Sequence, residues 1–224
     1  MARILSTKKL LPNQKQFLLN AGLSVIEADF IQINYKSPEL QEIKNNLIFT
    51  SQNAVRSVLQ MKDHERLRGK NCFCVGTKTR ALLEEKGFQV MASPDYASDL
   101  GAMISKDYQD QSFTFLSGNL RQDLLPDILR NACIDFNETE VYETVLTPVP
   151  VKSTIDGILF FSPSAVQSYK KDNTIANAVC FCIGNTTAAA LEHKTQNIII
   201  ANQPSVENTI IQCINYYNTV KAQP

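Results

Sequence analysis

The chain carries nearly the same thirteen residues twice. CFCVGTKTRALLE spans 72–84, and CFCIGNTTAAALE spans 180–192, 108 positions further on. Upstream of each copy, LIFTSQNAVRSV (47–58) parallels ILFFSPSAVQSY (158–169). A resemblance this long, with nearly constant spacing, predicts two versions of one folding unit.

The length and composition fit that reading. At about 100–200 residues per domain, 224 residues allow one or two domains. A hydrophobic content of 44% with 20% charged residues is typical of a folded globular protein rather than a disordered one. The net charge of +0 argues against a dedicated nucleic-acid-binding protein. No apolar run reaches the roughly 18 residues of a membrane span, and the N-terminus lacks a secretory signal, so we expect a cytoplasmic protein with neither a nucleic-acid nor a membrane partner.

The cysteines indicate core packing. Four of them form two C-x-C pairs, Cys72 with Cys74 and Cys180 with Cys182, and each pair would point to one face of a strand. The spacing is not C-x-x-C, and the two histidines lie elsewhere in the sequence. We therefore expect reduced thiols in the core, and neither a metal site nor a disulfide framework.

Short apolar runs alternate with amphipathic stretches along the whole chain, which predicts an α/β fold with parallel sheets. Strands are expected near 3–6, 24–33, 47–51, 72–76, 88–92, 113–117, 138–146, 157–162, 178–183 and 197–201. Helices are expected near 12–21, 52–61, 78–87, 96–107, 120–131, 163–171, 186–193 and 205–217.

The repeat also constrains the domain organisation. The second copy supplies only three strands, fewer than a usual sheet needs, and the unused strands are at the N-terminus. We therefore expect a discontinuous lobe 1, made of 1–33 and 149–224, and an inserted lobe 2, made of 38–141. The two crossings, 34–37 and 142–148, would be linker strands.

The loops after the strands are candidates for a binding site. Gly76 and Gly184 each follow an apolar strand and precede small polar residues at the start of a helix, where unpaired N–H groups favour anions. Ser51 and Ser162 have the same relation to their helices and are candidate N-caps. Capping alone would explain any one such loop. Several similar loops, lining one cleft if the lobes face each other, would suit a small molecule with several carboxylates.

No conventional catalytic set is visible. The sequence contains no G-x-S-x-G, no H-E-x-x-H, no Walker A and no G-x-G-x-x-G pattern. An enzyme of this composition would work mainly by positioning its substrate, an effect worth up to roughly 7–11 kcal/mol.

Seven segments in order resemble the uroporphyrinogen-III synthase family, and together they cover most of the chain. They are IFTSQNAV, VGTKTRALLEEKGF, FLSGNLRQDLLPDILR, VYET, FFSPSAV, IGNTTAAAL and PSVENTI. The resemblance implies two flavodoxin-like lobes joined by a two-stranded linker, with a cleft between them. It implies conversion of hydroxymethylbilane to uroporphyrinogen III, with loss of water and inversion of ring D, without a metal or organic cofactor. We expect a monomer.

The resemblance also implies roles for individual residues. Tyr142 matches the tyrosine of the VY-x-T element, and the resemblance implies that it assists loss of the substrate hydroxyl. The residues that match substrate-binding loops are Ser51, Asn53, Thr79, Ser117, Gly118, Asn119, Ser162, Ser164, Thr186 and Thr187. Departures from the family pattern occur at Gln52-Asn53 and at Asn185, which stand where a proline is common.

Two other functions remain open from the residues. The chain could be a catalytically silent two-lobed binding protein for a small polycarboxylate. It could also be a regulatory domain of the same fold that binds a protein partner. The ratio of type III to type I uroporphyrin formed from hydroxymethylbilane separates these alternatives from the enzyme.

Overall fold

The structure is a computed structural model that describes residues 1–40, 42–62, 64–192 and 194–221. Residues 41, 63, 193 and 222–224 fall within the predicted lobes, and 193 within a predicted helix, but they lie outside the described residues. The chain divides into two compact units, which are described separately. Unit 1 is Met1–Gln32 with Val145–Pro224, and unit 2 is Ile33–Thr144.

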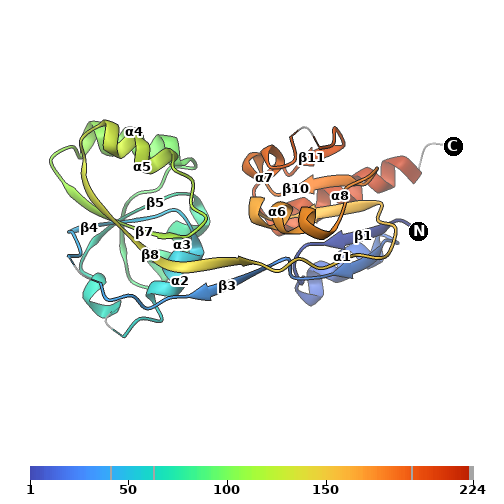
Figure 1. Cartoon of the computed structure of the whole chain (residues 1–224), viewed down its shortest axis with the longest axis horizontal. Coiled ribbons are helices and arrows are strands. Elements are labelled where there is room, and N and C mark those ends of the chain that lie inside the picture. Colours follow the sequence, from blue (N-terminus) through green and yellow to red (C-terminus); the bar gives the residue numbers. More distant parts are fainter. Residues whose placement is uncertain (41, 63, 193, 222–224) are drawn as a thin grey trace. The chain divides into compact units, whose positions relative to one another are not determined.

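Unit 1 contains a five-stranded parallel sheet with the order β11-β10-β9-β1-β2 (Figure 1). Its strands are β1 (Arg3–Ser6), β2 (Ser24–Glu27), β9 (Gly157–Phe160), β10 (Val179–Cys182) and β11 (Ile198–Ile200). Its helices are α1 (Pro12–Asn20), α6 (Pro163–Asp172), α7 (Asn185–Ala189) and α8 (Val206–Lys221). Counted along the chain, this is the strand order 2-1-3-4-5 of flavodoxin-like folds, as predicted.

Helices cover both faces of this sheet because successive strand residues point to opposite sides. Ile4 on β1 belongs to the cluster that includes Leu18 of α1 and Ile210 of α8. Leu5, the next residue, belongs to the cluster that includes Val166 of α6. The sheet is therefore buried on both faces, which explains its nearly continuous apolar strands.

Unit 2 contains a six-stranded sheet with the order β3-β8-β7-β4-β5-β6. Its strands are β3 (Ile31–Tyr35), β4 (Asn46–Phe49), β5 (Asn71–Cys74), β6 (Gln89–Ala92), β7 (Ser112–Gly118) and β8 (Asp135–Leu146). Its helices are α2 (Gln52–Val58), α3 (Thr77–Glu85), α4 (Ala97–Asp107), α5 (Leu124–Asn131) and the 3₁₀ helix His64–Leu67. The chain passes between the units twice, once within β3 and once within β8.

The sequence repeat corresponds to the same strands in each sheet. The order β6-β5-β4-β7-β8 in unit 2 matches β11-β10-β9-β1-β2 in unit 1, so the repeated segments form β4 with β5 and β9 with β10. In unit 2, the first of these five strands along the chain is the central strand β4, whereas in unit 1 it is β1. The two units thus share a spatial order of strands but differ in which strand comes first in the sequence.

The paired cysteines lie in the cores, as predicted. Cys72 and Cys74 of β5 belong to one hydrophobic cluster of unit 2, and Phe73 between them belongs to the cluster on the other face. Cys180 and Cys182 have the same relation to Phe181 in unit 1. All four thiols are free and buried.

The prediction of one strand over 24–33 is wrong. β2 ends at Glu27 and pairs with β1 of unit 1, whereas β3 begins at Ile31 in the sheet of unit 2. The break is held by hydrogen bonds from the Ala28 and Phe30 N–H groups to Ser6 and Thr7 carbonyls, at 3.1 and 3.2 Å. Hydrophobic alternation continues across the break because Phe30 is buried in unit 1, so the pattern alone does not reveal it.

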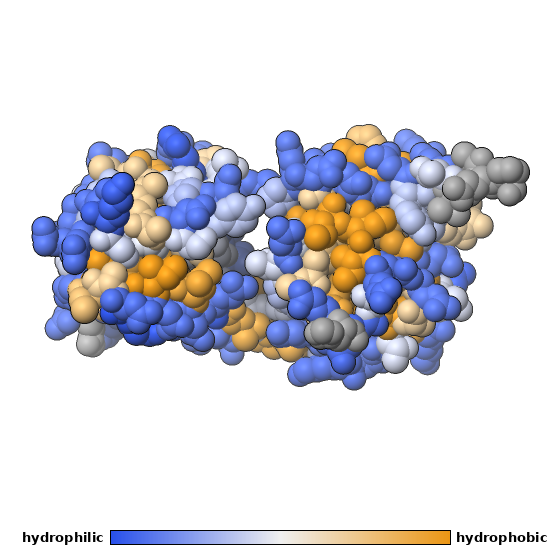
Figure 2. All heavy atoms as spheres, turned by 90° about the horizontal axis from the view of Figure 1, so that it is seen from above, coloured by the Kyte–Doolittle hydropathy of each residue, from blue (hydrophilic) through white to orange (hydrophobic). Residues whose placement is uncertain are grey.

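The surface is mostly hydrophilic in the view of Figure 2, which also shows a larger hydrophobic area on unit 1. Large exposed apolar residues of unit 1 include Ile200 on the edge strand β11 and Ile211 on α8. Among the described residues, no helix combines the length and apolar character needed to cross a membrane.

Candidate active site

The predicted site residues follow the carboxyl ends of strands in both units. In unit 2, the chain goes from β4 to α2 on one face of the sheet and from β7 to α5 on the other. In unit 1, β9 leads to α6 and β1 leads to α1 in the same way. Crossovers that depart to opposite faces leave a crevice between adjacent strands, where open α/β sheets bind ligands. The pairs β4–β7 and β1–β9 therefore mark the candidate site of each unit.

Two predicted serines cap the helices that begin there. The Ser51 hydroxyl accepts a hydrogen bond from the Asn53 N–H at 3.1 Å, and the Ser162 hydroxyl accepts one from the Ala165 N–H at 3.1 Å. Ser164 lies 3.0 Å from Ser162, hydroxyl to hydroxyl. The capping roles predicted for Ser51 and Ser162 are confirmed. Each helix start also carries the positive end of the helix dipole, which favours a negatively charged ligand.

The two repeat threonines are equivalent and buried. Thr79 and Thr187 are the third residues after Gly76 and Gly184, and their N–H groups donate to those glycine carbonyls, both at 3.1 Å. Their exposed fractions are only 5% and 1%. Neither hydroxyl is among the fully buried side-chain atoms that lack a hydrogen-bond partner, which in the described part of the chain are Ser168 Oγ and Tyr217 Oη. Thr186, by contrast, is exposed.

Only one of the two repeat glycines has a backbone conformation that requires glycine. Gly76 has φ +83, in the left-handed region that other residues rarely adopt, whereas Gly184 has an extended φ of −176. The loop of Gly76 is fixed by a hydrogen bond from its N–H to the Pro94 carbonyl at 2.8 Å. The two loops therefore share a sequence pattern but not a backbone conformation.

Tyr142 lies against Gly118 because the ladder between β7 and β8 is irregular. Ser117 pairs with Glu140, but Gly118 pairs with Tyr142, so Val141 has no partner in this register. The Val141 carbonyl instead accepts hydrogen bonds from the Lys36 N–H, at 2.8 Å, and from the Ser57 hydroxyl. This bulge places the half-buried Tyr142 ring over the backbone of Gly118.

Asn119 fixes the next part of β8. Its side-chain oxygen accepts from the Thr144 N–H at 2.8 Å, and its side-chain nitrogen donates to the Thr144 carbonyl at 3.3 Å. Its backbone N–H donates to the Tyr142 carbonyl at 3.3 Å. Ser117 is buried at the end of β7, with an exposed fraction of 6%. Both polar ends of the Asn119 side chain are thus engaged beside Tyr142.

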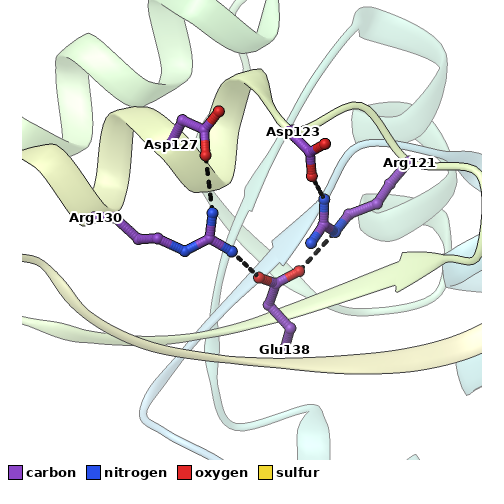
Figure 3. Close-up of polar contacts among 5 residues, drawn as sticks. All are labelled: Arg121, Asp123, Asp127, Arg130 and Glu138. Atoms are coloured by element: carbon purple, nitrogen blue, oxygen red, sulfur yellow. Dashed lines mark hydrogen bonds and ion pairs between the residues drawn. The ribbon is translucent and has the colours of Figure 1, made fainter.

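Sequence reasoning missed an ion-pair cluster that adjoins this loop (Figure 3). Glu138 on β8 bridges two guanidinium groups, accepting from Arg121 Nε at 2.6 Å and from Arg130 Nη2 at 3.0 Å. Arg121 also pairs with Asp123, and Arg130 pairs with Asp127 at 2.8 Å. Partial burial lowers the pKa of Arg121, but the Asp123 hydrogen bond and the Glu138 charge outweigh it and raise the pKa. The cluster ties α5 to β8.

Neither a metal-ligand cluster nor a groove marks the predicted site among the described residues. No group of three or more His, Cys, Asp or Glu side chains in the described ranges could hold a metal ion. A groove of about 520 Å³ in unit 2 and one of about 330 Å³ in unit 1 contain none of the predicted site residues among their lining residues. These two grooves therefore do not coincide with the strand-end loops.

Comparison with known proteins agrees with this arrangement. A family model described as uroporphyrinogen-III synthase HemD matches residues 14–211. Uroporphyrinogen-III synthetase from Helicobacter pylori has a similar structure, with a TM-score of 0.74 at 22% identity over 96% of this chain and 100% of that chain. A mutant uroporphyrinogen III synthase from Thermus thermophilus gives a TM-score of 0.72 at 13% identity, covering 100% of both chains. These identities establish the fold alone, and the match to the family model establishes the family. No curated protein matches the chain significantly.

Proposed function

The chain belongs to the uroporphyrinogen-III synthase family, and from that premise we propose which of its residues carry out the family's reaction. The family consists of cyclising lyases of tetrapyrrole biosynthesis that convert hydroxymethylbilane to uroporphyrinogen III, with loss of water and inversion of ring D. The observation that carries this assignment is the match to the family model over 14–211.

The strand-end loops bind the carboxylates of the substrate in this proposal. The residues that take part are Ser51, Asn53, Thr79, Ser117, Gly118, Ser162, Ser164, Thr186 and Thr187, with Asn119 holding the loop of unit 2. Support comes from the unpaired N–H groups at the starts of α2 and α6, where Ser51 and Ser162 already cap the helices. Carboxylates accept such hydrogen bonds without requiring charged partners.

Tyr142 is the proposed proton donor. Its phenol hydroxyl can give a proton to the departing hydroxyl, which leaves as water. The resulting azafulvenium cation is attacked by the last pyrrole ring through its substituted carbon, and the spiro intermediate that forms rearranges to the inverted ring. The proton released as that ring becomes aromatic again restores the phenol, so hydroxymethylbilane gives uroporphyrinogen III and one water. The bulge at Val141 and the space above Gly118 support the role of Tyr142, because they fix its backbone and its ring.

Product choice is the central catalytic task. Unassisted closure of hydroxymethylbilane is easy and gives the unrearranged type I isomer. The enzyme therefore has to stabilise the transition state of one path over that of another, which is differential transition-state binding. Many neutral donors on two folded units suit that task better than one strongly activated group.

Three further features belong to the proposal. The enzyme acts as a monomer, without a metal or organic cofactor, and in the cytoplasm. Reduced, buried thiols such as Cys72 and Cys180 agree with a reducing compartment. Light scattering of the purified chain tests whether it is a monomer. Activity after treatment with a chelator tests whether it works without a metal.

The function itself is tested by supplying freshly prepared hydroxymethylbilane to the purified chain, oxidising the products and separating the porphyrin isomers. We expect type III to exceed type I by a margin that grows with enzyme concentration. Formation of type I alone, at the rate seen without protein, would refute the enzymatic assignment and favour a catalytically silent binding domain.

A further inference from the structure

The turn after β1 carries two lysines, Lys8 and Lys9, and among the described residues only Lys9 pairs with a carboxylate. Lys9 pairs with Asp29 at 4.0 Å, and its N–H donates to the same carboxylate at 2.8 Å. Lys15 pairs with Glu27, which also accepts from the Leu10 N–H. Lys8 has no ion-pair partner among the residues that the structure describes. The turn therefore carries an unbalanced positive charge at Lys8.

Lys8 is held at the place where unit 1 is expected to bind a ligand. The Ser6 hydroxyl donates to the Lys8 carbonyl at 2.6 Å, and the Thr7 hydroxyl donates to the Leu159 carbonyl of β9 at 2.7 Å. These bonds fix the turn across β1 and β9, the two strands whose crossovers depart to opposite faces. The lysine backbone is thus attached to rigid elements and not to a free loop.

The side chain of Lys8 extends toward the loop that carries the predicted site residues. Its Nζ atom lies 5.6 Å from the centroid of the Phe161 ring. Phe161 immediately precedes Ser162, the N-cap of α6. The ammonium group is therefore directed to the end of β9, beside a helix start that also favours anions.

We propose that Lys8 binds a carboxylate of the tetrapyrrole substrate, a contact that rests on the function proposed above. An unpaired ammonium group at a ligand-binding edge gives a charge-assisted hydrogen bond without first having to break an ion pair. Lys9 and Lys15 are adjacent cations, but each would have to leave its carboxylate partner to make the same contact. The lysine that lacks a carboxylate is thus the one available to the substrate.

The alternative is that Lys8 only packs on Phe161. A cation resting on an aromatic ring stabilises the folded protein without any ligand. The two roles predict different measurements, because packing affects unfolding whereas a carboxylate contact affects substrate affinity and its dependence on salt.

The test compares Lys8→Gln with Lys9→Gln, its neighbour with the same charge change. In Lys8→Gln we expect KM for hydroxymethylbilane to rise about tenfold with little change in kcat, since one charge-assisted bond is lost in ground state and transition state alike. Lys9→Gln should stay within about twofold of the wild type. Added salt should raise KM of the wild type more than that of Lys8→Gln. Lys8→Arg should recover most of the affinity.

Two results would overturn the proposal. An unchanged KM in Lys8→Gln together with a lower melting temperature would leave only the packing role. Equal rises in KM for both glutamine variants would indicate a general surface charge rather than a specific contact. The isomer ratio of the wild type reports separately on the proposed function.

Discussion

Gly118 lies so close to the ring of Tyr142 that a β-carbon at position 118 would be 2.4 Å from Cζ of the tyrosine. Real Cβ contacts essentially never reach such a distance, and three ring carbons of Tyr142 would be nearer than 3.0 Å. The ring therefore occupies the volume that a side chain at 118 would need. The absence of a side chain is what lets the tyrosine lie there.

Gly118→Ala should displace the Tyr142 ring and lower kcat. The ring has to rotate away or the strands have to separate, and either movement takes the phenol from its place. We expect a fall in kcat approaching that of Tyr142→Phe, and a loss of stability of about 1–3 kcal/mol from overpacking. Steady-state kinetics and denaturant unfolding measure the two effects.

Gly69→Ala is the matched control for that experiment. A β-carbon at Gly69 would meet no atom within 4 Å, so kcat should not change. The double variant Gly118→Ala/Tyr142→Phe should be little slower than Tyr142→Phe alone, because both substitutions remove the same proton donor. Fully additive losses would show that Gly118 acts independently of the tyrosine.

Tyr142→Phe should lower kcat by roughly 10²–10⁴, the usual range for general acid catalysis. The substitution keeps the ring and removes only the hydroxyl, so the contact with Gly118 remains. Product affinity should change little, because the proposed carboxylate contacts lie in other loops. Spontaneous closure then competes with slower turnover, and the proportion of type I should rise at fixed enzyme concentration. Full turnover with only a lower melting temperature would leave Tyr142 as a packing residue.

Asn119→Ala should lower kcat with little effect on KM. The side chain holds the Thr144 backbone at both its N–H and its carbonyl, and its loss frees β8 just beyond Tyr142. Hydrogen exchange of the Thr144 amide should become faster, which reports directly on the lost bond. Asn131→Ala, at the exposed end of α5, is the control and should alter neither value. A large rise in KM for Asn119→Ala would instead indicate that the side chain contacts substrate.

Thr79→Val and Thr187→Val should each weaken substrate binding modestly. Valine is close in volume to a threonine side chain that is nearly buried, and it removes only the hydroxyl. A lost hydrogen bond to a charged group costs roughly 1.5–3 kcal/mol at most, and backbone donors remain. Titration with the product measures the change, with the exposed Thr77→Val as control. Unchanged binding in both variants would show that the threonines only pack at the helix starts.

The sequence predicts the layout of this protein well because the layout depends on patterns that repeat. Buried strands such as Val179–Cys182 are short and apolar, and the helices that follow the four repeated strands have a serine or glycine at their N-caps, so strand and helix alternate visibly in the sequence. The repeat predicts only that the N-terminal strands belong to the first lobe, whereas the flavodoxin-like strand order 2-1-3-4-5 agrees with what the family resemblance implies.

Side-chain contacts across strands could not be predicted in the same way. Whether Asn119 reaches Thr144, or Glu138 joins Arg121, depends on the register between β7 and β8, and a bulge shifts that register at Gly118. A shift of one residue moves every later side chain to another neighbour. Spacing along the chain carries no information about such a shift, so the loop could be identified but its bonds could not.

The buried thiols predict how stability depends on pH. Burial raises the pKa of Cys72, Cys180 and Cys182 to about 12, from a value of 9.0 for an exposed thiol. Between pH 9 and 12 the unfolded chain therefore loses protons that the folded chain retains. The unfolded state binds fewer protons there, so the free energy of unfolding is intact below pH 9 and falls as pH rises toward 12.

Each such thiol should contribute a slope of about 1.4 kcal/mol per pH unit within that window. Urea unfolding at pH 8, 9, 9.5 and 10 measures it under reducing conditions. Cys182→Ala should be less stable than the wild type at pH 8 because a buried atom is lost, but its stability should fall less steeply above pH 9. Val166→Ala removes buried atoms from the same core cluster without removing a titrating group, so it should lower stability equally at every pH. If Cys182→Ala and Val166→Ala show the same slope, ionisation of the buried thiol does not contribute to alkaline unfolding.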